Sequence, residues 1–348
     1  MSLLTLPDGF PTEIRSEVSP KVEHLPTEPW FFIGDTSIQA LWQPWAPAAP
    51  LGELWLQPSE QTKSMSEVLA CLETWSRHQL SRQAVIVCAG GGVLSDVVGL
   101  AASLYQRGLR WHVWPTTLVA QVDASIGGKT GINFGEAKNQ VGSFFPPTRV
   151  VLCHDFLKTL PSAHLKNGQW EMIKIALLEG DIPWLHSLSE HLGRPETTVA
   201  QPSDIERCVL SKVALVHQDP REQGDRKLLN LGHTIGHIVE AASHFEIAHG
   251  QAVGFGLIVA CQMAAAMGLS HFPSLLLEGW RTQLQSSGHP WPTWEQCAPF
   301  LGWDKKKEYG TDEAIFREPL PRYGERALLV SCTRPSFEAA FRKVWAQF

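Results

Sequence analysis

The amino-acid sequence predicts an α/β domain followed by a helical domain. Up to about residue 155, short apolar runs bounded by turn residues alternate with stretches of helical spacing, which favours a mostly parallel sheet with helices on both faces. Beyond that point the strand signals fade and helical patterns dominate. The length of 348 residues also suggests two domains, which we place at 1–160 and 161–348.

The individual elements follow from these patterns. In the first domain we expect strands at 29–34, 52–57, 84–89, 111–116 and 149–153, with helices at 64–79 and 94–107. The second domain is expected to be all-α, with helices at 162–179, 183–192, 202–217, 228–245, 251–267, 273–287 and 335–347. The proline-rich stretch 44–50 and the segment 287–303 are expected to be loops.

The composition indicates a soluble globular protein, because 44% of the residues are hydrophobic, 18% are charged and the net charge is −6. This balance favours neither nucleic acid nor an anionic membrane as a partner. The seven cysteines form no CxxC pair, so we expect no disulfide framework, and a reducing cytoplasm fits best. We expect no signal peptide, and the longest apolar stretch, 253–269, is predicted to be a buried helix rather than a membrane span.

Three consecutive glycines, Gly90 to Gly92, directly follow an expected strand and precede a helix that we expect to begin near Leu94 or Ser95. Glycines at such a turn let the backbone approach a pyrophosphate, and the helix N-terminus supplies positive potential. Asp96 would lie in the first turn of this helix, where it caps the helix or contacts a ribose or nicotinamide group. The pattern differs from GxGxxG, so an ordinary tight turn is an equally good interpretation.

The segment 121–142, QVDASIGGKTGINFGEAKNQVG, is rich in glycine and polar side chains and has no strong periodicity. We expect a loop in which Lys129, Lys138 and Asn139 form a cradle for a phosphate or carboxylate. A Walker loop is excluded because the GxxxxGK[ST] spacing is absent. The alternative is a solvated loop with surface lysines.

An expected helix carries Glu171 and Lys174 three residues apart among apolar neighbours. At this spacing a charged pair is often an exposed ion pair. Here the apolar neighbours imply burial, and a buried carboxylate needs a partner such as a metal ion.

The segment 226–250 places three histidines around a single expected helix. His233 and His237 are four residues apart, so a helix stacks them on one face, while His249 follows in a turn closed by Gly250 and could fold back towards that face. Neutral imidazole is the commonest protein ligand for zinc-like metals. The segment therefore indicates a metal site with three candidate histidines.

Candidate residues for binding an anionic substrate lie close by in the sequence. Glu222, Arg226 and Asn230 recur at four-residue spacing, and Lys212 lies on the preceding helix. The run 304–307, DKKK, adds cations, although a solvated surface is the more ordinary interpretation of such a run.

Taken together, these motifs resemble the 3-dehydroquinate synthase family of sugar phosphate cyclases. The similarity covers about residues 30–310 and is strongest over 84–253. The family's order and spacing are kept by the strings GGGVLSDVVGLAASLYQRG, PTTLVAQVDASIGGKTGIN, KNQVGSF, LKTLP, EMIK, LLNLGHTIGHIVE and HGQAVG. The resemblance implies a dehydroquinate synthase-like fold with a Rossmann-like N-terminal domain.

The resemblance also implies the composition of the site. A zinc or cobalt ion would be held by Glu171, His233 and His249, which leaves His237 to the substrate phosphate and to proton transfer. Implied NAD contacts are Asp35, Glu60, Lys63, Gly91, Gly92, Asp96, Thr116, Thr117, Asp123, Lys129 and Lys138. Implied substrate contacts are Asp123, Lys129, Lys138, Asn139, Lys174, Lys212, Arg226, Asn230, His237 and Lys305 or Lys306, with Arg107 reaching in from the partner subunit of a homodimer. The expected catalytic residues are Lys129, Asn139, Lys174, Glu222 and His237.

The implied reaction converts 3-deoxy-D-arabino-heptulosonate 7-phosphate to 3-dehydroquinate and phosphate, a step of the shikimate pathway. It combines transient oxidation by NAD, phosphate elimination, reduction and intramolecular aldol closure. One alternative is a cyclase that acts on sedoheptulose 7-phosphate or glucose 6-phosphate, which lack the carboxylate expected at Lys212 and Arg226. Another is a metal-dependent polyol dehydrogenase, which would not need the phosphate cradle and would release NADH. A non-enzymatic binding module would be expected to have lost some of the polar site residues.

The chain also departs from the family pattern. The stretch between Asp35 and Glu60 is shorter than usual, Gln251 replaces a glutamate, and Pro220 replaces an acidic residue. None of these changes removes a residue assigned to the metal or the substrate.

Overall fold

The structure, a computed structural model, describes residues 2–42, 49–135, 137–192, 200–286, 288, 290–303 and 315–348. Its backbone packs into two compact units, of which the first comprises 1–165 and 202–217 and the second comprises 166–201 and 218–348. Helix α6 (Pro202–Gln218) therefore packs with the N-terminal half, an arrangement that a single boundary at residue 160 does not describe.

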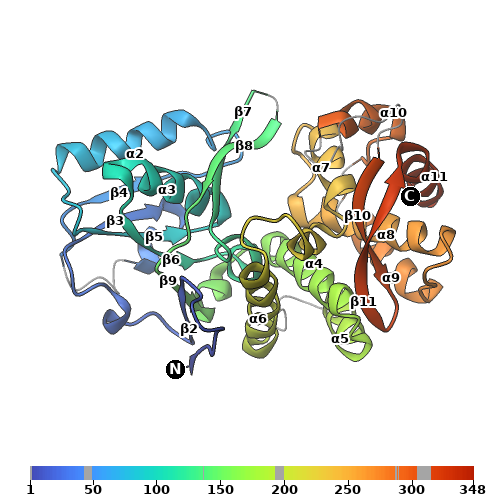
Figure 1. The fold of residues 1–348 in the computed structure, drawn as a ribbon, viewed down its shortest axis with the longest axis horizontal. Coiled ribbons are helices and arrows are strands. Elements are labelled where there is room, and N and C mark those ends of the chain that lie inside the picture. Colours follow the sequence, from blue (N-terminus) through green and yellow to red (C-terminus); the bar gives the residue numbers. More distant parts are fainter. Residues whose placement is uncertain are drawn as a thin grey trace. The chain divides into compact units, whose positions relative to one another are not determined.

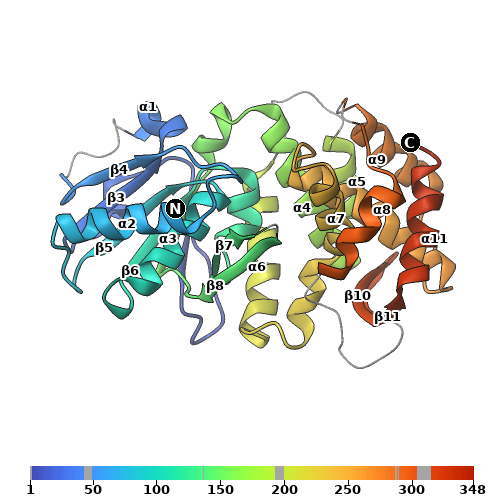
Figure 2. The ribbon, with the colours of Figure 1, turned by 90° about the horizontal axis from the view of Figure 1, so that it is seen from above.

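The first unit is built on a seven-stranded sheet, with α2 and α3 side by side over it (Figures 1 and 2). The strand order is β1-β2-β9-β6-β5-β3-β4, and all neighbouring pairs from β2 to β4 are parallel. The strands are β1 (Ser2–Leu3), β2 (Glu13–Glu17), β3 (Trp30–Asp35), β4 (Glu53–Leu56), β5 (Val85–Gly90), β6 (Arg110–Pro115) and β9 (Arg149–Cys153). In addition to α6, this unit contains the α-helices α1 (Gln39–Trp42), α2 (Met65–Arg77) and α3 (Gly92–Leu104). The predicted α/β class is confirmed.

The central strands are buried on both faces. All six residues of β5 and the first five of β3 are buried, so side chains pointing to either side of the sheet are covered. These continuous apolar runs are why the sequence predicted both strands. The short strand β2, which lies between β1 and β9, was not predicted, because Ile14 is the one apolar residue among its five and gives little hydrophobic signal.

A hairpin replaces the loop expected at 121–142. A turn of π-helix (Ala120–Ala124) leads into β7 (Lys129–Phe134), which pairs antiparallel with β8 (Ala137–Phe144). The glycines that suggested a loop permit close pairing of the two strands. A Cβ on Gly142 would lie 2.2 Å from the Thr130 carbonyl oxygen.

The second unit is mostly helical, as predicted, but it also contains a β-hairpin. Its helices are α4 (Ser162–Glu179), α5 (Ile182–Leu192), α7 (His233–Ala242), α8 (His249–Ala266), α9 (Ser274–Gln285), α10 (Trp294–Cys297) and α11 (Arg334–Trp345). The hairpin joins β10 (Ile315–Arg322) to β11 (Glu325–Thr333) through a turn with Gly324 at φ +80° (Figure 1). Strand β10 was not predicted because it contains Pro319 and Pro321, and proline is uncommon inside β-strands. The helical turns at 294–303 likewise lie where a loop was expected.

The single helix expected at 228–245 is interrupted. A 3-10 helix (Asp225–Asn230) ends before Gly232, whose φ of +76° breaks the helix, and α7 begins at His233. The break brings the backbone of this junction against α8. A Cβ on Gly256 of α8 would lie 1.9 Å from the Gly232 carbonyl oxygen, so the two segments meet backbone to backbone.

Two more glycines bring α8 equally close to α4. A Cβ on Gly250 would lie 2.2 Å from the Asn167 carbonyl oxygen, and one on Gly254 would lie 2.6 Å from the Trp170 ring. Helix α8 is therefore packed against both α4 and the start of α7 at distances that side chains would not allow.

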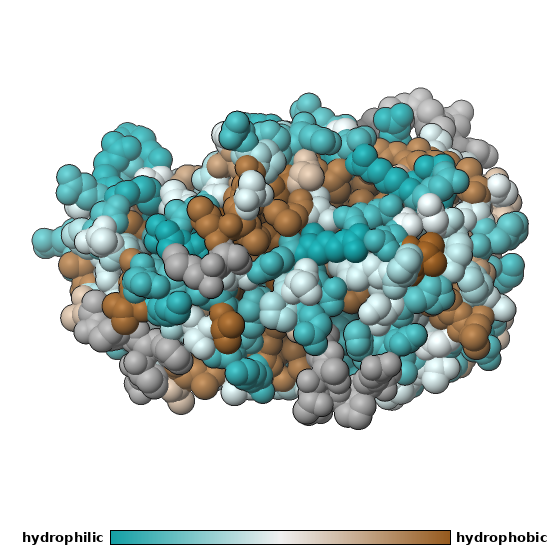
Figure 3. All heavy atoms as spheres, turned by 90° about the horizontal axis from the view of Figure 1, so that it is seen from below, coloured by the Kyte–Doolittle hydropathy of each residue, from teal (hydrophilic) through white to brown (hydrophobic). Residues whose placement is uncertain are grey.

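No helix in the described part of the chain is long and apolar enough to cross a membrane. The face shown in Figure 3 mixes hydrophilic and hydrophobic side chains.

We expect Gly256→Ala to destabilise the protein by about 3 kcal/mol, because the added methyl group would overlap the Gly232 carbonyl and push α7 away from α8. Thermal and urea unfolding would measure the loss. Gly279→Ala in α9 is the matched control, because a Cβ there meets nothing within 4 Å. This control should be neutral or stabilising, by up to about 1 kcal/mol. Equal effects at the two positions would contradict the close contact as the cause.

Candidate functional site

Three helices of the second unit bring Glu171, His233 and His249 together. One ligand atom from each lies within 4.8 Å of the other two. The His249 Nε2 atom is 3.0 Å from Glu171 Oε1, and the His233 Nε2 atom is 3.6 Å from the same oxygen. Glu171 is 1% exposed and His233 is 8% exposed, whereas the His249 side chain is partly accessible. A carboxylate and two imidazoles in such a cluster suit a zinc-like ion, and three protein ligands leave a coordination position for a substrate.

His249 reaches this cluster differently from the way we expected. It is the first residue of α8, and Gly250 lies inside that helix rather than closing a turn. The placement follows from the contact of Gly250 with the α4 backbone, one helical turn before Glu171. His249 thus joins Glu171 through helix packing and not through a folded-back loop.

The third histidine, His237, lies outside the three-donor cluster. It is exposed on α7, and its ring centroid lies 5.4 Å from that of His233 and 6.3 Å from that of His249. Spacing alone left all three histidines open as ligands. The geometry sets His237 beside the donors, where its exposed ring could contact a substrate.

Neighbouring groups hold each of the three donors. The Lys174 Nζ atom lies 2.6 Å from Glu171 Oε2, which leaves the other carboxylate oxygen towards the histidines. His233 Nδ1 lies 3.1 Å from the Leu231 carbonyl oxygen, and because a carbonyl can only accept, Nδ1 carries the proton and donates. His249 Nδ1 lies 3.2 Å from Glu240 Oε2.

The two histidines differ in their affinity for protons. Burial lowers the pKa of His233 well below its ordinary value, so this ring is neutral and can act as a ligand. Burial also acts to lower the pKa of His249, but the carboxylates of Glu240 and Glu171 outweigh it and raise the pKa to about 10. A metal ion must therefore displace a proton from His249.

The residues expected at the substrate carboxylate occupy both units. In the second unit, Arg226 is 1% exposed and donates to the Pro220 carbonyl oxygen at 2.6 Å. Asn230 donates to Glu222 Oε1 at 2.7 Å. In the first unit, the Lys212 Nζ atom donates to both the Asp123 carboxylate and the Asp123 carbonyl, each at 2.7 Å.

The glycine turn lies where the strand order of the parallel sheet reverses. In chain order, β4 is added on one side of β3 and β5, β6 and β9 are added on the other, so the direction in which strands are added across the sheet reverses between β3 and β5, while the strands themselves stay parallel. Asp35 ends β3, Gly91 follows β5, and Thr116 and Thr117 follow β6. Ligands of open α/β sheets bind at the carboxyl ends of the strands at this reversal.

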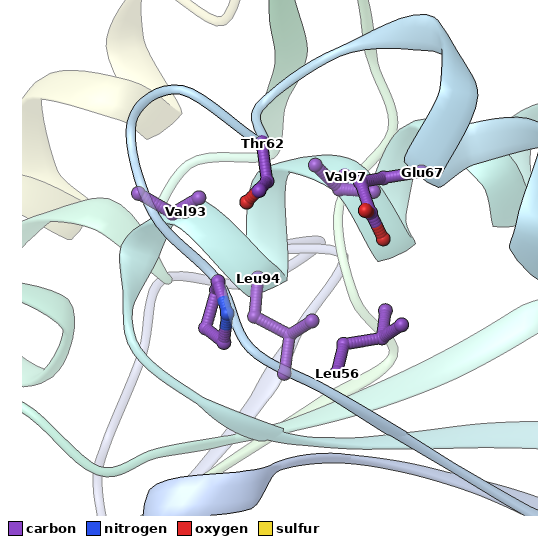
Figure 4. Close-up of a pocket in the computed structure, with 7 residues that line it drawn as sticks. Leu56, Thr62, Glu67, Val93, Leu94 and Val97 are labelled. Atoms are coloured by element: carbon purple, nitrogen blue, oxygen red, sulfur yellow. The ribbon is translucent and has the colours of Figure 1, made fainter.

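The turn leaves little room for side chains. A Cβ on Gly91 would lie 3.1 Å from Thr117 Cγ2, and one on Gly92 would lie 2.9 Å from the Ala124 Cβ. Gly91 is also the N-cap of α3, so this helix begins without a capping side chain, as expected where a phosphate is bound. A small, mostly apolar hollow lies beside the start of α3 (Figure 4), lined by Leu56, Pro58, Thr62, Glu67, Val93, Leu94 and Val97.

Asp96 does not cap the helix, which was one of the two roles that we expected for it. Because α3 begins at Gly92, Asp96 lies in its second turn. There its Oδ2 atom lies 2.5 Å from the Nζ atom of the buried Lys63, which also donates to Asn139 Oδ1 at 2.6 Å. Burial raises the pKa of the Asp96 carboxyl, and the Lys63 ammonium only partly offsets this effect.

The same network continues through Glu60. The Lys138 Nζ atom lies 3.4 Å from Glu60 Oε1, and Asn133 donates to that oxygen at 2.8 Å. Asn133 also accepts the backbone N–H of Asn139 at 3.0 Å. Asn133 was not predicted, although its place in the strand KTGINF, among the phosphate-cradle candidates, was the available signal.

Two other predicted residues are exposed. Lys129 is exposed at the start of β7, and Arg107 is exposed at the end of a 3-10 helix (Tyr105–Arg107). Lys305 and Lys306 lie outside the described residues. Glu240 had no predicted role, although its position seven residues after His233 places it on the same helix face.

Known proteins resemble this chain in both sequence and fold. The family model described as 3-dehydroquinate synthase N-terminal matches residues 53–167, and the one described as 3-dehydroquinate synthase C-terminal matches residues 168–307. The 3-dehydroquinate synthase of Thermococcus kodakarensis is 37% identical over 80% of this chain and 79% of its own length. That of Alkaliphilus metalliredigens is 43% identical over 61% of this chain, and the match spans 60% of the relative's length.

A solved structure resembles the fold over nearly its full length. It is the 2-epi-5-epi-valiolone synthase ValA of Streptomyces hygroscopicus subsp. jinggangensis, described with NAD+ and Zn2+ bound. The TM-score is 0.84 and the sequence identity is 26%, over 99% of each chain. With both family models matched in order across the two halves of the chain, the protein belongs to the 3-dehydroquinate synthase family.

Proposed function

We propose that the protein is an NAD- and metal-dependent 3-dehydroquinate synthase. Its reaction is the conversion of 3-deoxy-D-arabino-heptulosonate 7-phosphate to 3-dehydroquinate and phosphate. The observation that carries the proposal is the buried cluster of Glu171, His233 and His249, with Lys174 against Glu171, in a member of this family. The glycine turn at the reversal of the parallel sheet supports a nucleotide cofactor in the same chain.

The donor set fits a zinc or cobalt ion, and the narrow turn at Gly91 fits a dinucleotide phosphate. When bound, the metal supplies a Lewis acid for a substrate C–O bond and NAD supplies a reversible hydride acceptor. Lys174 holds one oxygen of Glu171 and so keeps the other directed towards the histidines. Lys63 holds Asp96 in the same way beside the glycine turn.

The other proposed roles concern charge and protons. Lys129, Lys138 and Asn139 would position the phosphate, and the exposed His237 would exchange a proton with it. Lys174 and Glu222 would be further catalytic residues. Lys212, Arg226 and Asn230 would bind the substrate carboxylate, which distinguishes this substrate from sedoheptulose 7-phosphate and glucose 6-phosphate. The exposed Arg107 would act in the partner subunit of a homodimer.

The decisive assay follows phosphate and NADH together. Purified protein supplied with Zn2+ and NAD should release phosphate from the carboxylated heptulosonate without net NADH, because the hydride is returned within the cycle. Release from sedoheptulose 7-phosphate or glucose 6-phosphate instead would identify another cyclase. NADH that accumulates with substrate turnover would identify a polyol dehydrogenase.

We expect His233→Ala to lose bound metal and to reduce phosphate release by roughly 100-fold or more, because a buried ligand is removed. Metal content after dialysis and phosphate release would both be measured. His271→Ala is the control, since it removes an exposed histidine of the same unit. Full metal content in His233→Ala would contradict its assignment as a ligand.

We expect Lys212→Ala to raise the KM for the heptulosonate by about 10-fold or more, because a charge-assisted contact with the substrate carboxylate is lost. Lys212 is preferred over Arg226 for this test because the fully buried Arg226 also supports the Pro220 carbonyl. Lys158→Ala, which removes an exposed lysine, is the control. A change confined to the KM for NAD would instead mean that Lys212 serves to hold Asp123.

A further inference from the structure

Helix α7 carries a second buried acidic side chain close to the metal cluster. Glu240 is 2% exposed, and its Oε2 atom lies 3.2 Å from the Nδ1 atom of His249. An ionised carboxylate is expensive to bury unless a hydrogen-bonding or charged group receives it. A buried carboxylate is therefore unusual at this position, and it contacts His249, a candidate metal ligand.

The two ring nitrogens of His249 face two different carboxylates. Nε2 lies 3.0 Å from Glu171 Oε1, on the side of the donor cluster, and Nδ1 faces Glu240. An imidazole that binds a metal through one nitrogen keeps its proton on the other. An acceptor at Nδ1 therefore fixes the tautomer and the ring orientation that present Nε2 to the cluster.

His233 provides an internal comparison. Its Nδ1 atom donates to a neutral acceptor, the Leu231 carbonyl oxygen, at 3.1 Å. His249 has a charged acceptor instead, and a carboxylate makes the opposite nitrogen a stronger electron donor than a carbonyl does. His249 is also the more accessible of the two rings, so it has less surrounding structure to hold its orientation.

We propose that Glu240 is a positioning residue that orients His249 and strengthens it as a metal ligand. This inference rests on the proposed function in so far as Glu171, His233 and His249 bind a metal. It adds a residue that acts through His249 and does not itself bind metal, substrate or NAD.

The test measures metal affinity without substrate or NAD. Metal-free protein would compete with a chromophoric chelator for Zn2+ at one fixed pH. Glu240→Gln keeps an acceptor but removes the charge, so Zn2+ affinity should fall by about 10-fold. Glu240→Leu removes both, so the loss should approach about 100-fold, the range seen for groups that orient metal-bound histidines. With Co2+ in place of Zn2+, the visible spectrum of both variants should change.

Glu318→Gln is the matched control. Glu318 is 3% exposed and accepts a hydrogen bond from Thr234 Oγ1 at 2.6 Å, so it is a second buried carboxylate in contact with α7. Removing its charge should lower the unfolding temperature and leave Zn2+ affinity unchanged. Wild-type affinity in both Glu240 variants would overturn the proposal, and so would an equal loss in Glu318→Gln, because the effect would then be general destabilisation of α7.

This design separates the inference from the proposed function. A protein that binds Zn2+ through Glu240-oriented His249 but makes no dehydroquinate would overturn the function and keep the inference. If the wild-type protein makes dehydroquinate but the Glu240 variants keep its Zn2+ affinity, the inference is overturned and the proposed function is kept.

Discussion

The close contact of α8 with its two neighbours determines where the candidate metal ligands lie. Helix α4 presents Glu171, α7 presents His233, and α8 begins with His249. A Cβ on Gly256 or Gly250 would overlap a carbonyl oxygen of the neighbouring segment at 1.9 or 2.2 Å. The ligand atoms come within 4.8 Å of one another because these backbones can touch. The site therefore depends on the two glycines that permit this packing as well as on the three donor side chains.

Most long elements could be predicted because their burial gives a regular hydrophobic pattern. Helix α4 and the buried strands β3 and β5 are of this kind. The two hairpins escaped prediction for opposite reasons. In β7–β8 the glycines that allow close strand pairing resemble loop residues, and in β10 the prolines resemble a break. Helix ends were also misplaced where one glycine decides the geometry, as at Gly232 with its φ of +76°.

The candidate site was predictable as a set of residues but not as a set of contacts. The histidines and Glu171 were identified from residue type and from the family resemblance. Spacing could not decide whether His237 shares the metal, because residues four apart lie on one helix face whatever their role. The pairing of Lys63 with Asp96 joins a loop to the second turn of α3 and depends on tertiary structure. Asp96 was misplaced because the helix begins two residues earlier than its apolar pattern indicates.

The buried charges of the site form pairs, and this changes how substitutions combine. Lys174 and Glu171 are each 1% exposed and lie 2.6 Å apart, and Glu171 and Glu240 both contact His249. Removing one member of a buried pair leaves its partner charged and unsolvated, which costs more than the pair itself contributes. Each single substitution should therefore reduce stability by more than the paired interaction contributes, and the effects of two substitutions in the same group should not be additive. Glu171, Lys174, His249 and Glu240 are best understood as one electrostatic unit, in which the histidine orientation and the carboxylate charge support each other.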